Sequence, residues 1–246
     1  MQRFDIKNKV LFITGAGRKN GIGHALVVDA IKKGAKKVYA TARNQTHVQQ
    51  LKDAFSENVT PMKLDVTDLK AVRKAAEDAQ VLINNAGVVS PSSYLGHFNP
   101  DIAHLEMETN YFGPMYLINA FKECLFQNQH SAIVNIISVG GLYPAPIHVT
   151  YSASKAALYS STQALRIEMH RAQHPIPVFG VYPGPINTDM TKDMNTPKAT
   201  SKEVALRVFD GMKEGVLDIT TDAFSDHFKG FFKQDPELLG ALRAAL

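Results

Sequence analysis

The chain has few of the features that mark secreted, membrane-bound or zinc-stabilised proteins. Among its 246 residues Cys124 is the single cysteine, which excludes an internal disulfide and a cysteine-based structural zinc site. We interpret Cys124 as a small buried residue of a helix. No apolar run reaches the roughly 18 residues of a membrane-spanning helix, and no apolar signal segment follows the charged N-terminal residues. We therefore expect a cytoplasmic protein with no metal site and no membrane contact.

Blocks of like charge, internal repeats and low-complexity tracts are also missing. The formal net charge of +4 is spread along the chain, so it does not indicate a nucleic-acid partner or a membrane surface. Hydrophobic residues make up 45% of the chain, enough for one substantial core at this length. We therefore expect residues 1–246 to form a single domain.

Short apolar runs alternate with stretches of helical pattern. Continuous apolar runs are typical of strands buried on both faces of a parallel sheet; we expect strands at residues 10–13, 37–42, 60–66, 81–87, 131–138 and 177–182. We expect helices at residues 24–33, 44–57, near 68, at 101–127, at 150–170 and at 202–213. This alternation predicts an α/β fold with a right-handed, doubly wound parallel sheet. Residues 189–201 read as a substrate loop and residues 215–246 as an aromatic C-terminal tail that packs on the body or on a second subunit.

A glycine-rich loop separates the first expected strand from the first helix. Gly15, Gly21 and Gly23 lie in this loop. Glycines let the backbone approach a pyrophosphate, and the helix N-terminus presents free N–H groups to it. The loop therefore indicates a dinucleotide site, with an ordinary turn as the alternative.

The end of the second expected strand points to the form of the dinucleotide. An acidic residue there would accept hydrogen bonds from a free ribose 2′-hydroxyl, which Ala42 cannot do. Arg43 can instead pair with a 2′-phosphate, and Arg18 and Lys19 add positive charge unless they are simply exposed loop cations. The pattern predicts NADP(H).

Polar residues also follow the third and fourth expected strands. Asp65 and Val66 could border the adenine, with an N-cap of the next helix as the alternative for Asp65. In the stretch from Asn84 to Gly87, the asparagines could tie neighbouring strand ends together, and Gly87 leaves room for a flat ligand. Turn chemistry alone would also produce this stretch.

Tyr151 and Lys155 are four residues apart on an expected helix, so both can point into one pocket. A fixed ammonium favours the phenolate, and we expect the pKa of Tyr151 to fall from about 10 toward neutrality. Tyr151 would then serve as a general acid and base near pH ~7. Ser138 ends the strand that precedes this helix. Asn110, in the middle of an apolar helix, needs a partner and could form a bulge that holds a water.

With these residues in this order, the chain resembles the short-chain dehydrogenase/reductase family over roughly residues 8–190. The motifs that carry the resemblance are Thr14-Gly15, Gly21-Ile22-Gly23, Asn84 to Gly87, Asn110, Ser138, Tyr151-x-x-x-Lys155, Pro183-Gly184 and Thr188. The resemblance implies a Rossmann-type sheet in three layers. It also implies that a catalytic tetrad is formed by Asn110, Ser138, Tyr151 and Lys155.

The resemblance assigns a role to each member of this tetrad. Tyr151 would be the general acid and base, and Ser138 would hold the substrate oxygen. Lys155 would bind the nicotinamide ribose and lower the pKa of Tyr151, while Asn110 would position a water in a proton relay. It further implies dinucleotide contacts from Gly15, Gly21, Ile22, Gly23, Asn85, Ala86, Gly87, Pro183, Gly184, Ile186 and Thr188, in addition to those expected above from Arg18, Arg43, Asp65 and Val66.

Two departures from the family pattern limit the inference. Gly15 and Gly21 are six residues apart instead of four, as in the related enoyl reductases. Those enzymes place six residues between tyrosine and lysine, and here that position is Leu158. The glycine-rich seventh strand of the family is also missing from the sequence, which puts a tetramer in doubt and leaves a homodimer through residues 101–127 and 150–170 plausible.

The combined interpretation is an NADP(H)-dependent enzyme that interconverts a carbonyl and an alcohol. The substrate would be a small, apolar molecule, because the expected wall residues are Val88, Val89, Val139, Leu142, Tyr143, Pro144, Pro146, Met190 and Met194. The alternatives are an enoyl reductase and a non-catalytic NADP(H)-sensing protein. A sugar-nucleotide epimerase or dehydratase normally needs a larger C-terminal domain than the segment after Thr188 can form.

Overall fold

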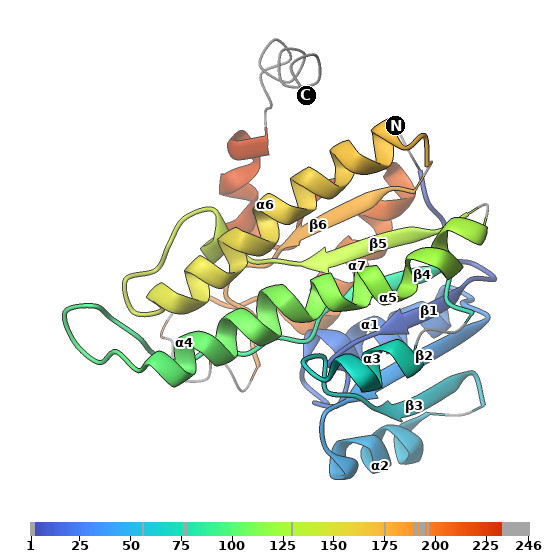
Figure 1. Cartoon of the computed structure of the whole chain (residues 1–246), viewed down its shortest axis with the longest axis horizontal. Coiled ribbons are helices and arrows are strands. Elements are labelled where there is room, and N and C mark those ends of the chain that lie inside the picture. The colour runs from blue at the N-terminus through green and yellow to red at the C-terminus, as the bar shows by residue number, and fades with distance from the viewer. Residues whose placement is uncertain are drawn as a thin grey trace.

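Parallel strands form one sheet with helices on both faces (Figure 1). The computed structural model describes residues 3–55, 57–75, 78–128, 130–174, 176–188, 191, 195 and 197–232. The strands are β1 (Val10–Ile13), β2 (Lys37–Ala42), β3 (Val59–Lys63), β4 (Val81–Asn84), β5 (Ala132–Ile136), β6 (Val178–Tyr182) and β7 (Asp218–Thr220). Their order is β3-β2-β1-β4-β5-β6-β7, and all pairs are parallel. The predicted doubly wound, Rossmann-type single domain is confirmed.

The helices divide between the two faces and complete three layers. On one face lie α1 (Ile22–Lys32), α2 (Gln45–Ala54) and α7 (Ser201–Glu214), whose buried residues share one core cluster. On the other lie α3 (Leu69–Ala75), α5 (Gly113–Gln127) and α6 (Val149–Arg171). In Figure 1, α5 and α6 lie in front of the sheet and α1 and α7 behind it.

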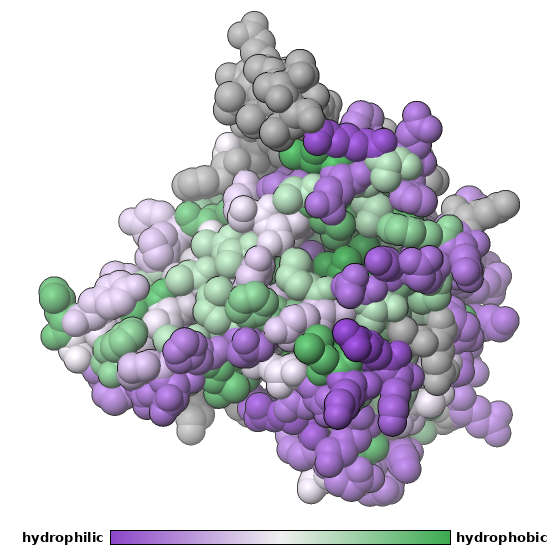
Figure 2. Space-filling model, in the orientation of Figure 1, coloured by the Kyte–Doolittle hydropathy of each residue, from purple (hydrophilic) through white to green (hydrophobic). Residues whose placement is uncertain are grey.

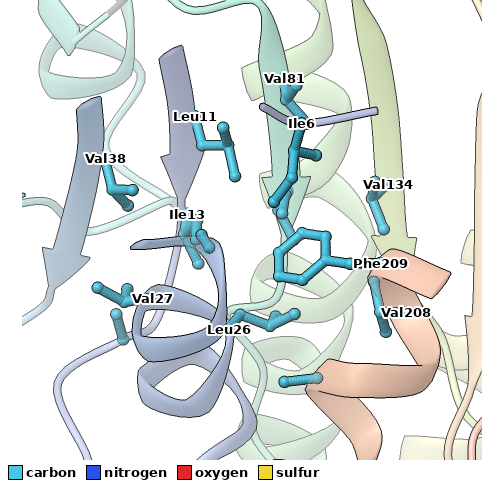
Figure 3. Packing of buried hydrophobic residues seen from close by; sticks show 14 of the residues in the cluster. Ile6, Leu11, Ile13, Leu26, Val27, Val38, Val81, Val134, Val208 and Phe209 are labelled. Carbon is cyan, nitrogen blue, oxygen red and sulfur yellow. The ribbon is translucent and has the colours of Figure 1, made fainter. Parts of the chain in front are cut away.

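Alternation along each strand assigns its side chains to the two cores. Leu11 and Ile13 of β1 face the hydrophobic cluster that includes α1 and α7. Figure 3 shows these two side chains in the same cluster as Leu26 of α1 and Phe209 of α7. Phe12 faces the opposite cluster and lies 4.7 Å from Phe121 of α5, measured between ring centroids. Because both faces are covered, the strands read as continuous apolar runs in the sequence.

A seventh strand is present, although it is not the glycine-rich strand that we found missing from the sequence. β7 pairs with β6 and lies at the edge of the sheet. Residues 215–232 of the expected tail therefore belong to the domain, since α8 (Ala223–Asp226) and the short helix η4 (His227–Phe232) follow β7. Polar contacts hold this strand: the guanidinium of Arg166 donates to the Asp218 carboxylate at 3.0 Å and to the Leu217 carbonyl at 2.7 Å.

The long helix expected at residues 101–127 is interrupted. It consists of α4 (Pro100–Met107), one π-helical turn η1 (Glu108–Phe112) and α5. Asn110 lies in this wide turn, so the bulge expected at Asn110 is confirmed.

The loop expected at residues 189–201 falls largely outside the described residues, and Met190 and Met194 are among those not described. A parallel bridge between Ile186 and Ala199 closes the base of this loop.

Within the described chain, no helix is both long and apolar enough to cross a bilayer. The same residues contain no group of three or more histidine, cysteine or acidic side chains placed to hold a metal ion.

Candidate active site

A cavity of about 620 Å³ lies beyond the carboxyl ends of the strands. Strand order reverses between β1 and β4, the place where open α/β sheets bind ligands. The cavity brings together every residue of the predicted site except Asn110: Gly15, Arg18, Gly21, Ile22, Gly23, Arg43, Asp65, Val66, Asn85, Ala86, Gly87, Ser138, Tyr151, Lys155, Pro183, Gly184, Ile186 and Thr188. Sequence segments far apart in the chain therefore share one site.

The glycine loop has the close backbone contacts that a dinucleotide cradle requires. Gly15 adopts a positive φ of 69°, and a Cβ there would lie 2.8 Å from the Cα of Ala86. A Cβ at Gly23 would lie 2.5 Å from the carbonyl oxygen of Gly15. Gly21 precedes α1 and provides no side-chain cap for its first turn, so the first N–H groups of α1 remain available to an anion. The loop therefore fits a pyrophosphate.

Thr14 and Asn85 tie the ends of β1 and β4 together, as expected for the asparagine pair. The Asn85 amide donates to the carbonyl oxygens of Thr14 at 2.8 Å and Gly15 at 3.2 Å. The Thr14 hydroxyl accepts from the backbone N–H groups of Asn85 and Ala86, both at 2.9 Å. These bonds fix the floor of the cavity at the switch point.

Two guanidinium groups, those of Arg18 and Arg43, border the cavity. Arg18 lies in the glycine loop and Arg43 follows β2, and both line the cavity with exposed side chains. Among the described residues neither forms an ion pair within 4.0 Å. The carboxylate of Asp65, also in the lining, accepts from the backbone N–H and hydroxyl of Thr67 and forms a turn. Asp68, not Asp65, accepts from the first N–H groups of α3.

Ser138 and Tyr151 meet near the middle of the cavity. Ser138 follows β5, and its hydroxyl accepts from the backbone N–H of Gly140 at 3.0 Å. Burial raises the pKa of Tyr151, a hydrogen bond with the Ser138 side chain lowers it, and the negative charge of Glu106 raises it. The Tyr151 phenol and the Ser138 hydroxyl both line the cavity, so together they can bind one oxygen atom of a substrate.

Lys155 lies on α6, the helix that carries Tyr151, and its side chain is buried, with 4% of the residue exposed. Its ammonium donates to the carbonyl oxygen of Ile136 at 2.8 Å and lies 5.9 Å from the centre of the Tyr151 ring. Burial lowers the pKa of Lys155 to about 8. The ammonium therefore has a fixed position but a weakened hold on its proton.

The expected direction of the Tyr151 pKa was wrong. We expected Lys155 to pull that pKa toward neutrality, whereas burial raises it above its ordinary value. At 5.9 Å from the ring, and with its charge engaged by the Ile136 carbonyl, the ammonium does not offset the cost of burying a phenolate.

Asn110 does not line the cavity but holds its wall from behind. Its amide oxygen accepts from the backbone N–H of Val88 at 2.8 Å, and its amide nitrogen donates to the Val88 carbonyl at 2.8 Å. The same nitrogen donates to the hydroxyl of Ser154 at 2.9 Å. The buried amide thus has the partners that its burial requires, and its water-positioning role stays a prediction.

Sequence reasoning missed Glu106 and His148. Glu106 is fully buried on α4, accepts from the backbone N–H of Ser90 at 2.8 Å and accepts from the Thr150 hydroxyl at 2.5 Å. His148 lines the cavity and contacts the edge of the Tyr151 ring, with 6.5 Å between ring centroids. Neither residue belongs to a motif. The available signal was the position of Glu106, an acidic residue one helical turn before Asn110 in an apolar helix.

The remaining wall of the cavity is apolar and aromatic. The expected wall residues Val88, Val89, Val139, Tyr143, Pro144 and Pro146 line it, and Leu142 does not. The C-terminal segment adds Phe224 and Phe228, whose rings lie 5.7 Å apart, and Phe228 lies 6.3 Å from Tyr143. We expected the aromatic residues of the tail to pack either on the body of the domain or on a second subunit; Phe224 and Phe228 pack on the body. The Asp222 carboxylate, just before them, accepts from the backbone N–H of Gly184 at 2.9 Å.

Comparison with known sequences places the chain among dehydrogenases. A family model described as short chain dehydrogenase matches residues 9–199. The dehydrogenase/reductase SDR family member 7B of Bos taurus is 31% identical over 235 residues, which cover 88% of this chain and 66% of the bovine protein. The 3-oxoacyl-(acyl-carrier-protein) reductase FabG of Vibrio cholerae is 31% identical over 204 residues, which cover 80% of this chain and 81% of that protein.

Solved structures agree with this assignment. A short chain dehydrogenase from Burkholderia cenocepacia, in complex with NADP, matches with a TM-score of 0.85 and 32% identity, covering 98% of this chain and 99% of that one. A short chain dehydrogenase/reductase from Burkholderia phymatum, in complex with NAD, has a TM-score of 0.79 but 21% identity, covering 95% of this chain and 98% of that one. This second likeness supports the fold alone.

Proposed function

This chain belongs to the short-chain dehydrogenase/reductase family of oxidoreductases, and we propose that it interconverts a carbonyl and an alcohol with NADP(H). The observation that carries the proposal is the meeting of Ser138, Tyr151 and Lys155 beside a glycine cradle in one cavity. A proton donor, a second hydroxyl and a buried cation at a dinucleotide site are what carbonyl reduction requires.

Each of these side chains has a defined task in the proposed reaction. When bound, the nicotinamide supplies or accepts the hydride. Tyr151 gives the proton to the substrate oxygen in reduction and takes it back in oxidation. Ser138 and Tyr151 donate hydrogen bonds to that oxygen as negative charge develops, a placement whose loss typically costs about 10²–10³ in rate. The Lys155 ammonium stabilises negative charge at the phenol, although at 5.9 Å from the ring its effect is smaller than that of burial.

The preference for NADP(H) over NAD(H) rests on charge. β2 ends at Ala42, which offers no acceptor to a ribose 2′-hydroxyl, and the Arg18 and Arg43 guanidiniums lie at that end of the cavity. Both can pair with a 2′-phosphate. The Burkholderia cenocepacia enzyme, 32% identical, was solved with NADP, which also supports this preference.

The substitution Tyr151→Phe tests the proposal. We expect wild-type protein to consume NADPH, measured at about 340 nm, with aldehydes or ketones, and to consume NADH more slowly. The variant should lose turnover by at least about 10² because the proton donor is gone, whereas NADPH should bind it nearly as tightly, measured by fluorescence titration. Equal loss of turnover and binding would show that Tyr151 is structural.

The same experiments distinguish the proposed function from two alternatives, an enoyl reductase and a non-catalytic NADP(H)-sensing protein. An enoyl reductase would need a cation where Leu158 stands, and that side chain is 1% exposed and packs with Ile137 and Tyr182. Turnover of enoyl thioesters but not of ketones would favour this alternative. A non-catalytic NADP(H)-sensing protein would bind NADPH and turn over neither compound class.

The assembly proposed for this enzyme is a homodimer, and its location the cytoplasm. In Figure 2, hydrophobic and near-neutral residues gather over α5 and α6 between hydrophilic margins. Leu105 of α4 and Phe112 of η1 are 45% and 37% exposed, and a second copy of the chain could cover such a helical face.

A further inference from the structure

His148 lines the cavity beside Tyr151, the residue proposed to transfer the proton. The walls of this cavity include Val88, Val89, Tyr143 and Phe224, which are apolar or aromatic. His148 has no part in the proton transfer proposed for Tyr151. A half-buried imidazole among apolar walls therefore requires a different explanation.

One hydrogen bond defines the protonation of the neutral ring. Nδ1 of His148 lies 3.1 Å from the carbonyl oxygen of Ser90. A carbonyl oxygen only accepts, so Nδ1 carries the hydrogen and donates it. In the neutral imidazole Nε2 is then a hydrogen-bond acceptor. Within the residues that the structure describes, Nε2 makes no hydrogen bond.

The ring has a firm support. Ser90, whose carbonyl oxygen accepts from the ring, is itself anchored, because its backbone N–H donates to the buried carboxylate of Glu106 at 2.8 Å. His148 directly precedes α6, which carries Tyr151 in its first turn. The imidazole and the phenol are neighbours, 6.5 Å apart at an interplanar angle of 72°. Both rings can therefore contact one small molecule.

We propose that His148 binds the substrate by accepting a hydrogen bond from a hydroxyl group next to the reacting carbonyl. The site then takes hydroxyketones in reduction and 1,2-diols in oxidation. This inference rests on the proposed function, because Ser138 and Tyr151 must hold the reacting oxygen. Hydride adds to the carbonyl carbon, the Tyr151 proton adds to its oxygen, and the neighbouring hydroxyl remains unchanged.

A pair of ketones separates this role from a structural one. We compare 2-hydroxyacetophenone with acetophenone for the wild type, His148→Phe and His148→Gln, with His104→Phe as control on the exposed surface of α4. Phenylalanine keeps a flat ring without an acceptor, whereas glutamine restores one. We expect His148→Phe to lose roughly three- to tenfold more kcat/KM for the hydroxyketone than for acetophenone, the effect of one hydrogen bond. His148→Gln should recover part of this loss, and His104→Phe should change neither rate.

Equal losses for both ketones would show that His148 only positions the wall, which overturns the inference and leaves the proposed function intact. Binding gives a readout without turnover: 1-phenylethane-1,2-diol and 1-phenylethanol are compared by thermal shift on the complex with NADPH, which cannot accept a hydride from either alcohol. We expect the wild type to bind the diol roughly three- to tenfold more tightly and His148→Phe to remove this difference. If the wild type binds the diol no more tightly, the inference is wrong even where ketones are turned over.

Discussion

At the scale of single residues, a buried carboxylate near the Tyr151 phenol distinguishes this site. Glu106 is fully buried, and its carboxylate raises the pKa of Tyr151. Sequence reasoning identified Ser138, Tyr151 and Lys155 because a spacing and a strand end marked them. It could not find Glu106 or His148, whose roles depend on the path of residues 88–93, a path that no local pattern encodes.

The substitution Glu106→Gln should move the pH profile of alcohol oxidation to lower pH. In the proposed mechanism Tyr151 acts as the base for oxidation, so the rate should rise with pH as the phenol ionises. Removing the Glu106 charge lowers the pKa of Tyr151, and the rise then begins at a lower pH. The measurement is kcat/KM for oxidation of 1-phenylethanol between about pH 6 and 10. An unchanged profile in a folded variant would show that the carboxylate charge does not reach the phenol.

At the scale of elements, continuous apolar runs were predictable and short or irregular elements were not. The bounds of β1 and β2 agree with prediction because every residue of β1 and nearly every residue of β2 is buried. β7 was missed because its three residues, Asp218 to Thr220, include one apolar side chain. Its place depends on Arg166 of α6, a contact distant in sequence.

The substitution Arg166→Met should destabilise the protein by about 2–3 kcal/mol, because it removes charged hydrogen bonds and leaves the Asp218 carboxylate, 13% exposed, without its ion pair. Guanidinium chloride unfolding measures the change. As a control, Arg207→Met breaks the more exposed pair with Asp226, where Arg207 is 44% exposed, and should cost less than about 1 kcal/mol. Similar losses in both variants would mean that the β7 contacts add no special stability.

At the scale of the whole molecule, the hydrophobic surface over α5 and α6 is the face through which we propose that two copies of the chain form a homodimer (Figure 2). We expect the wild type to sediment as a dimer in analytical ultracentrifugation. The double variant Leu105→Glu, Phe112→Glu should sediment as a monomer, since it buries unpaired charges at the interface.

The control for this experiment is Val216→Glu. Val216 is 43% exposed but lies between α7 and β7, so its substitution should leave the dimer intact. A monomeric wild type, or a double variant that still dimerises, would place the contact surface elsewhere.

Because β7 leads directly into Asp222 and Phe224, residues 215–232 complete the cavity as well as the sheet. The Asp222 carboxylate accepts from the backbone N–H of Gly184, and Phe224 lines the cavity. A protease cut after Glu214 would leave the glycine loop uncut but remove part of the cavity lining. Because Asp222 holds Gly184 in the cavity lining, such a cut would disturb the proposed dinucleotide contacts and the apolar wall together.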